Sequence, residues 1–330
     1  MLIAVNFHYI REESNYPFSA IHGLSAAQFK SQIQSLGKEG TFVSQDDIRR
    51  FLAHESELPE RSILVTFDDG LREQYEIAYP ILQELGVPAV FYVNPLNIQE
   101  GKISNVHQVH LLRSFVSTAD MLDGLGKLDL PLQLTDAERQ TAVSHYNYDS
   151  AEEAVLKYIL NFKMDFHTKD EVVNRLFEET FSAEETKRFH EAFYMTDHML
   201  RGLSEDGCLG SHTYSHQPLG LLSPEELDAE FEKSRAFFES KGLAMPRTVS
   251  YPYGSRASCA QPVLDKAKEF DFEFGFTMER AGNIQIRENA LNLARFDCND
   301  VIGGKSNLFE EGRMFDQIPV ASWEFSGCSA

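Results

Sequence analysis

Short apolar runs alternate with amphipathic helical stretches along most of this chain. Several of the runs are apolar throughout, which is typical of parallel strands that are covered on both faces. Alternation of strands and helices predicts a parallel α/β fold, most simply a (β/α) barrel. The expected strands are Leu2–Tyr9, Ile63–Phe67, Ala89–Val93, Cys208–His212, Thr248–Tyr251, Phe272–Thr277 and Leu291–Phe296.

Two helix starts are clearly marked in the sequence. Ser25 and Gln28 have the spacing of a capping box, in which each side chain bonds the backbone of the other residue. The segment Ser223-Pro224-Glu225-Glu226 supplies an N-cap, a proline at the first helical position and a glutamate at the third. We therefore expect helices to begin at both places.

The stretch 96–194 breaks the alternation. It has few β-type runs and several helical ones, at Val106–Val116, Ala151–Phe162 and Lys169–Phe181. We expect a single domain over 1–330, with 96–194 as a helical insertion between the third and fourth expected strands. In a barrel this connection leaves from the C-terminal face, where active sites are built. A stabilising lobe, a substrate lid and an oligomer contact all remain open, and the sequence does not indicate an oligomeric state.

Composition excludes some classes of partner. Thirty basic and 51 acidic residues give a net charge of −21, which argues against non-specific binding to nucleic acid or an anionic membrane.

The first residues lack the features of a signal peptide and are too few to span a membrane, so we expect a cytoplasmic protein. Scattered cysteines without a C-x-x-C pair are expected to be buried free thiols. They are Cys208, Cys259, Cys298 and Cys328.

Three polar segments follow expected strands. Asp68 and Asp69 are adjacent in a Thr-Phe-Asp-Asp-Gly segment, His212 and His216 are four residues apart, and Tyr251–Gly254 is a Tyr-Pro-Tyr-Gly turn. One carboxylate and two imidazoles form a typical ligand set for a catalytic divalent metal such as zinc, and a second carboxylate can act as a general base. Each segment alone also fits a simpler role: a helix N-cap, a pair of structural histidines and an ordinary turn.

Together and in this order, the segments resemble those of the polysaccharide deacetylases, also called the NodB-homology or carbohydrate esterase family 4 group. The resemblance covers roughly 1–95 and 195–300 of the chain. The segments that carry it are Phe7-His8-Tyr9, Thr66-Phe67-Asp68-Asp69-Gly70, Gly210-Ser211-His212, His216-Gln217-Pro218-Leu219, Tyr251-Pro252-Tyr253-Gly254, Gly275-Phe276-Thr277-Met278-Glu279 and Asn292-Leu293-Ala294-Arg295-Phe296.

The resemblance implies a distorted seven-stranded (β/α) barrel and a metal-dependent hydrolase that removes an N-acetyl group from a sugar or glycan intermediate. It implies that Asp69, His212 and His216 bind the metal. Asp68 would take a proton from the metal-bound water that attacks the amide carbon, and the Tyr253 backbone N–H would support the oxyanion. Zinc is the expected ion, and nickel, cobalt or manganese would also suit these ligands. A nucleotide-linked or lipid-linked N-acetylated sugar or glycan would fit as the substrate.

The chain departs from the family in the residue that protonates the leaving amine. Members commonly supply a histidine late in the chain, but no histidine follows His216, and the corresponding stretch offers Arg295. The arginine that usually precedes the third motif is also absent from its place. Arginine cannot donate a proton at neutral pH, so Arg295 is considered for binding a substrate carboxylate or phosphate. His8, at the end of the first expected strand, is the candidate acid, with a structural histidine as the alternative.

Two other functions remain open at this point. One is a C–N hydrolase of a small cyclic amide, resembling the allantoinase-type relatives of the family. The other is a catalytically impaired carbohydrate-binding scaffold, which the missing acid motivates. The adjacent Asp68 and Asp69 speak against a scaffold, because metal binding alone does not need the second carboxylate.

Overall fold

The computed structural model describes residues 1–11, 18, 21–128, 130, 132–146 and 150–323 of the chain. The chain divides into two compact units. The first takes its residues from 1–14, 23–102 and 191–330, and the second from 15–22 and 103–190. The three polar segments singled out in the sequence all belong to the first unit.

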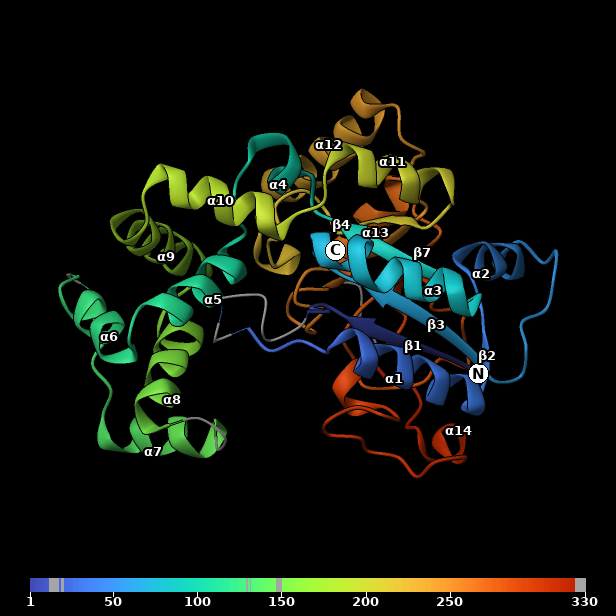
Figure 1. The fold of residues 1–330 in the computed structure, drawn as a ribbon, viewed down its shortest axis with the longest axis horizontal. Helices are drawn as coiled ribbons and strands as arrows, with labels where there is room; N and C mark the ends of the chain where they lie inside the picture. The colour runs from blue at the N-terminus through green and yellow to red at the C-terminus, as the bar shows by residue number, and fades with distance from the viewer. Residues whose placement is uncertain (12–17, 19–20, 129, 131, 147–149, 324–330) are drawn as a thin grey trace, which may run out of the picture. The chain divides into compact units, whose positions relative to one another are not determined.

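The first unit is built around a sheet of parallel strands (Figure 1). Seven strands follow one another in the order β7-β6-β5-β4-β3-β1-β8, and β2 lies off this path, paired with β3. The strands are β1 (Leu2–Phe7), β2 (Thr41–Phe42), β3 (Ser62–Phe67), β4 (Ala89–Val93), β5 (Leu209–Ser211), β6 (Thr248–Ser250), β7 (Phe274–Phe276) and β8 (Arg295–Asp297).

The seven strands form a nearly closed barrel. Its two outer strands, β7 and β8, are connected through Leu293, which lies two residues before β8 and forms a parallel bridge with Phe276. The Leu293 N–H donates to the Gly275 carbonyl at 2.9 Å, and the Thr277 N–H donates to the Leu293 carbonyl at 2.8 Å. The expected distorted seven-stranded (β/α) barrel is therefore confirmed.

Each of the seven expected strands overlaps an observed strand, but most of their boundaries differ. The largest difference is in the last one, where 290–292 form a 3₁₀ turn and the strand begins only at Arg295. Strand β2 was not expected. It has two residues, which is too short for a periodic pattern to be recognised in the sequence.

Helices of the first unit flank the strands (Figure 1). The expected capping box of Ser25 with Gln28 is present, and Ser223 is the expected N-cap of its helix, where it also forms a capping box with Glu226. The α-helices are α1 (Ala26–Glu39), α2 (Gln45–Leu52), α3 (Tyr79–Leu85), α4 (Pro95–Glu100), α11 (Asp197–Glu205), α12 (Pro224–Lys241), α13 (Gln261–Glu269) and α14 (Met314–Gln317). The shorter turns are the π-helical η2 (Gln74–Ala78) and the 3₁₀ turns η4 (Leu219–Leu221), η5 (Ala290–Asn292) and η6 (Cys298–Asp300).

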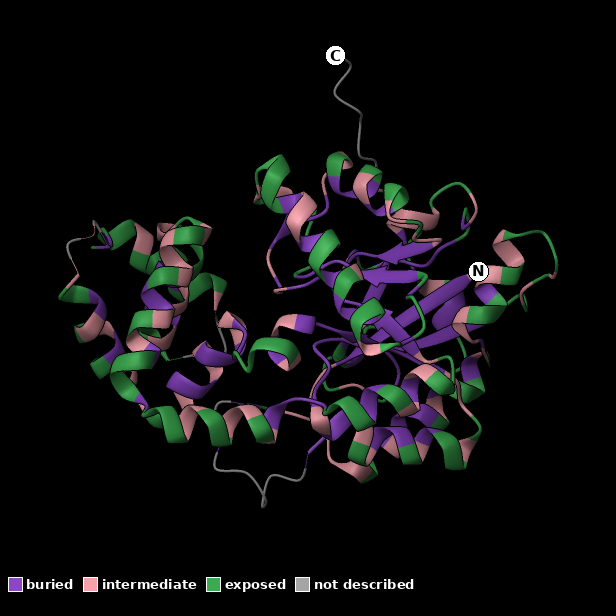
Figure 2. Ribbon diagram, turned by 90° about the horizontal axis from the view of Figure 1, so that it is seen from above, coloured by how far each residue is buried: buried purple, intermediate pink, exposed green. Residues whose placement is uncertain are grey.

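Strands β1 and β3 are buried along their whole length, and Figure 2 shows most of the sheet in the colour of buried residues. Along β1, the outward positions pack against helix α1, where the Phe7 and Phe29 rings lie 5.2 Å apart. Fully burying such a ring contributes about 1.5–3 kcal/mol. Successive strand residues point to opposite faces, so Leu2 and Ala4, which belong to a different cluster, share their face with Asn6. A polar side chain is thereby placed inside the barrel.

The second unit is helical in its described residues. The three helical stretches expected at 106–116, 151–162 and 169–181 all coincide with observed helices. The organisation as one domain with an insertion over 96–194 stays a prediction. The helices in this region are α5 (Asn105–Phe115), α6 (Thr118–Gly126), α7 (Asp136–His145), α8 (Ala151–Tyr158), the π-helical η3 (Ile159–Lys163), α9 (Phe166–Thr180) and α10 (Ala183–Phe193).

Two expectations from composition can be compared with the structure. Cys208, Cys259 and Cys298 are free thiols, but Cys208 is only partly buried. Cys328 lies outside the described residues. Within the described part of the chain, no helix combines the length and apolarity needed to cross a bilayer. The cytoplasmic location stays a prediction.

Candidate active site

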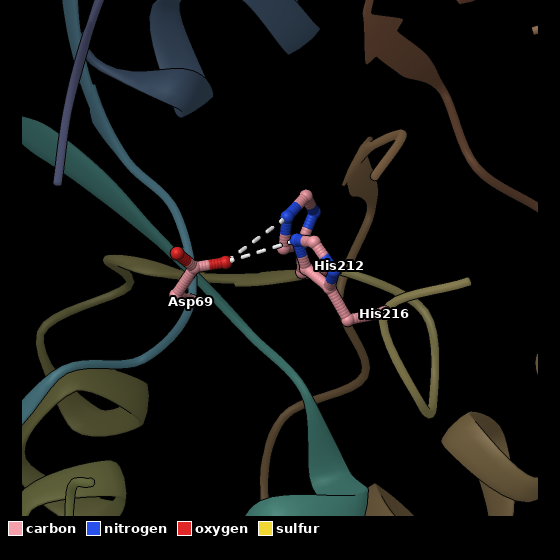
Figure 3. A group of neighbouring side chains, drawn as sticks. All are labelled: Asp69, His212 and His216. Atoms are coloured by element: carbon pink, nitrogen blue, oxygen red, sulfur yellow. Dashed lines mark ion pairs between the residues drawn. The ribbon is translucent and has the colours of Figure 1, made fainter. Parts of the chain in front are cut away.

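Asp69, His212 and His216 meet at the C-terminal end of the barrel strands (Figure 3). Asp69 lies two residues after β3, and His212 directly follows β5. The Nε2 atoms of His212 and His216 are 3.5 Å and 3.3 Å from Asp69 Oδ1, respectively. One possible ligand atom from each of the three buried residues lies within 4.8 Å of the others. The structure thus brings together the three residues expected to bind a metal.

Hydrogen bonding orients the His212 ring toward this point. Its Nδ1 is 2.6 Å from the Ser250 carbonyl oxygen, which can only accept, so Nδ1 carries the hydrogen. Burial lowers the pKa of His212 to about 4, and the ring is therefore neutral near pH 7. A neutral ring then presents the Nε2 lone pair to the Asp69 carboxylate. Two electron-rich atoms that face each other in a buried site fit a bound cation, and this donor set suits a divalent metal.

Unusual backbone conformations concentrate in the three polar segments. In the described residues, six amino acids other than glycine have positive φ, and four of them are Asp69, Thr213, His216 and Tyr253. Each such residue costs on the order of 1–3 kcal/mol and persists only where its surroundings enforce it. Such strain clusters at functional sites, which fits the convergence of these segments.

Asp68 is held by a second set of contacts. Arg295 Nη1 donates to Asp68 Oδ1 at 2.9 Å, and Arg295 Nη2 donates to Oδ2 at 2.7 Å. Asn6 Nδ2 also donates to Oδ2, at 2.9 Å. Burial of Asp68 opposes its ionisation, but the attraction of Arg295, the hydrogen bonds from its guanidinium and the nearby histidines together outweigh burial and hold the pKa of Asp68 well below its usual range. Asp68 is therefore an oriented carboxylate beside the metal-type cluster.

The structure corrects the role expected for Arg295. Its side chain has no exposed surface, and besides Asp68 it bonds Asn6 Oδ1 at 3.1 Å and Ser250 Oγ at 2.9 Å. The expectation that Arg295 binds a substrate carboxylate or phosphate is therefore wrong, because the guanidinium is enclosed and already paired with an internal carboxylate. It supplies, from β8, a cation next to Asp68.

His8 and Tyr253 lie in the same region as the cluster. Phe7 and Phe67 are register partners on adjacent parallel strands, so His8 and Asp68 follow at the same level. His8 is partly buried, and its positive charge, when present, lowers the pKa of Asp68. The Tyr253 side chain is 40% exposed, and its ring lies 5.0 Å from that of His216.

Sequence reasoning missed Asn6 and Ser250 as members of the site. Asn6 bonds both Asp68 and Arg295, and Ser250 bonds Arg295 through its hydroxyl and His212 through its carbonyl. Both are polar residues within apolar runs. Such residues are rarely buried without partners, and this signal could have marked them.

Comparison with known proteins identifies the family of this chain. The polysaccharide deacetylase model matches residues 55–118 and 172–275, about half of the chain. The chain belongs to the polysaccharide deacetylase family.

Individual relatives are distant. A poly-beta-1,6-N-acetyl-D-glucosamine N-deacetylase of Staphylococcus aureus (strain MSSA476) is 28% identical over 120 residues, 32% of this chain and 40% of the relative. The aligned segment thus spans less than half of that protein. Among solved structures, IcaB from Ammonifex degensii has a TM-score of 0.52 and 18% identity, covering 89% of this chain and 90% of that one. A de-N-acetylase from Aggregatibacter actinomycetemcomitans has a TM-score of 0.51 and 16% identity, covering 93% and 99%. These structures support the fold.

Proposed function

We propose that this protein is a metal-dependent hydrolase that removes an N-acetyl group from a sugar or glycan. The observation that carries the proposal is the convergence of Asp69, His212 and His216 beside Asp68, a carboxylate that is not needed to complete the cluster. Membership of the polysaccharide deacetylase family supports the same reaction.

Asp69, His212 and His216 would hold the ion. A bound divalent metal would acidify water and polarise the acetyl carbonyl. We expect zinc, and nickel, cobalt or manganese would also be accepted by this ligand set. The neutral state of His212 favours binding, because a protonated imidazole cannot be a ligand.

Asp68 would accept the proton of the attacking water. Its Oδ1 accepts one hydrogen bond from Arg295, whereas Oδ2 accepts two, from Arg295 and Asn6. A carboxylate has about four lone-pair sites in all, so Oδ1 retains one that can receive the water. Arg295 would keep the carboxylate ionised and oriented during this step.

The remaining steps concern the oxyanion and the leaving amine. The backbone N–H of Tyr253 would support the negative charge on the acetyl oxygen. His8 would protonate the sugar nitrogen as the C–N bond breaks, which releases acetate and a free amine. The position of His8 at the level of Asp68 supports this assignment, because an acid is needed on the same side of the barrel as the base.

We further propose that the substrate is an N-acetylhexosamine unit, in a glycan or linked to a nucleotide or lipid. The name of the S. aureus relative supports N-acetylglucosamine polymers as the first class to test. The net charge of −21 favours a neutral or cationic glycan over a polyanion and speaks against nucleic acid.

The test measures acetate release from β-1,6-linked N-acetylglucosamine oligomers and nucleotide-linked N-acetylhexosamines and, in parallel, ring opening of allantoin as a cyclic amide. Acetate release should require metal, disappear after chelation and return with Zn²⁺ or Co²⁺. Full metal loading without release of acetate from any N-acetylated sugar would reject the proposal. Ring opening of allantoin would then favour the cyclic-amide alternative, and sugar binding without turnover would favour a scaffold.

A further inference from the structure

The segment that carries His212 and His216 needs support from outside itself. It follows the three-residue strand β5 and contains two positive-φ residues, Thr213 and His216. Neither is glycine, so the segment does not prefer this path on its own. Whatever enforces the path also sets the spacing of the two imidazoles.

Glu230, on helix α12, bonds the centre of this segment. Its Oε2 accepts hydrogen bonds from the backbone N–H groups of Tyr214 and Ser215, at 3.0 Å and 2.9 Å. Its Oε1 accepts one from the Ser215 hydroxyl. Glu230 is 6% exposed, and among the described residues no lysine, arginine or histidine forms an ion pair with it. The buried carboxylate is thus satisfied by the segment between the two histidines.

A second residue of the same helix face bonds the beginning of the segment. Ser234 lies one turn after Glu230, and its Oγ is 3.1 Å from Ser211 Oγ. Ser211 Oγ in turn accepts the Thr213 N–H at 3.2 Å. Helix α12 therefore contacts the segment before Thr213 and after it, on either side of the first strained residue.

We propose that Glu230 is a positioning residue for the metal site, which acts by holding the 212–216 segment in the conformation that aims both imidazoles at Asp69. This inference rests on the proposed metal-dependent function. It assigns to α12 a part in metal affinity, although no residue of α12 belongs to the Asp69–His212–His216 cluster. Partners of metal ligands typically influence metal affinity by about 10–100-fold.

The experiment measures the dissociation constant for Co²⁺ on metal-stripped protein, by competition with a chromophoric chelator and by the visible absorption of bound Co²⁺. Glu230→Ala should weaken Co²⁺ binding by about tenfold or more and alter the absorption spectrum. Glu230→Gln, whose side-chain oxygen can still accept both N–H groups, should stay within about threefold of the wild type. Glu232→Ala is the matched control, because Glu232 is exposed on the same helix and its removal should change nothing.

Circular dichroism and thermal unfolding of the metal-free proteins separate positioning from folding. A folded Glu230→Ala protein with wild-type Co²⁺ affinity would overturn the inference. If this variant does not fold, Glu230→Asp decides in the same way, since its shorter side chain keeps the charge but cannot reach both N–H groups. A wild-type protein that binds no Co²⁺ would overturn both the metal site and the inference. Co²⁺ binding without acetate release would reject only the proposed reaction.

Discussion

The guanidinium of Arg295 pairs with both oxygens of Asp68, at 2.9 Å and 2.7 Å, across 227 residues of sequence. Both side chains are almost completely removed from solvent. The pair gives the proposed base a fixed orientation and a fixed charge. Arg295 would therefore act on the proposed base from inside the barrel, since its side chain is fully buried.

Removing the cation should leave a buried charge without its partner. We predict that Arg295→Met lowers the free energy of unfolding by about 3–5 kcal/mol. In the double variant Asp68→Asn/Arg295→Met much of this loss should be recovered, since no charge of the pair then remains buried. Urea unfolding measures the free energy of unfolding of the single and the double variant. Arg313→Met is the control, because Arg313 pairs with Glu310 at the surface and should contribute less than about 1 kcal/mol. Equal effects of Arg295→Met and Arg313→Met would contradict the importance of the pair.

Substitutions of the two neighbouring aspartates should have different effects on acetate release and on metal content. Asp68→Asn is expected to lower acetate release by about 100-fold or more while the folded protein still binds one metal ion, because Asp68 is paired with Arg295 and is not part of the cluster. Asp69→Asn should lose the metal itself. Metal content by mass spectrometry and acetate release are measured on the same folded samples. Loss of metal from Asp68→Asn would refute this division of roles.

The metal-free protein should become less stable in acid because of His212. Its pKa is about 4 in the folded state and 6.5 in the unfolded state, so the unfolded chain binds the proton first. Stability is present above pH 6.5 and is lost as the pH falls toward 4, by about 3 kcal/mol. His212→Asn should remove this component, so the free energy of unfolding of the wild type should fall relative to that of the variant by about 3 kcal/mol between pH 7 and pH 4. Urea unfolding at pH 7, 6, 5 and 4 measures it, and parallel curves would count against the neutral, buried imidazole.

His8 can be tested as a proton donor by changing the leaving group. His8→Gln should slow acetate release from an N-acetyl sugar by about 100-fold, because an amine must be protonated as it leaves. Hydrolysis of p-nitrophenyl acetate should change by less than about threefold, because that leaving group needs no proton. His198→Gln, at an exposed position on α11, is the matched control. Equal losses on both substrates would point to a structural or metal-related role for His8.

Much of the barrel could be predicted because its signals are local. Fully apolar runs mark buried parallel strands, and the cap residues Ser25 and Ser223 mark where helices begin. The convergence of Asp69 with the two histidines also follows, since residues after parallel strands share one end of a barrel. Strand β2 could not be found, because a two-residue strand has no periodicity.

The contacts that support the site could not be predicted in the same way. An arginine such as Arg295 is a common type of substrate-binding residue. Only the structure of the nearly closed barrel shows that its side chain turns inward to Asp68. Glu230 lies at helical spacing from Leu227 and Phe237, on the buried face of α12, but this spacing does not show which group its carboxylate bonds. Such pairings depend on distances between elements that are remote in sequence, and the type of residue alone does not specify them.

The order of the site residues along the chain has a consequence for how the protein is made. Asp69, His212 and His216 have all been synthesised well before β8, which carries Arg295. A product of premature termination between these points contains all three residues of the proposed metal site but lacks the cation that holds Asp68. Metal content alone would therefore not show that the proposed base has its partner, and preparations should be judged by intact mass as well as by bound metal.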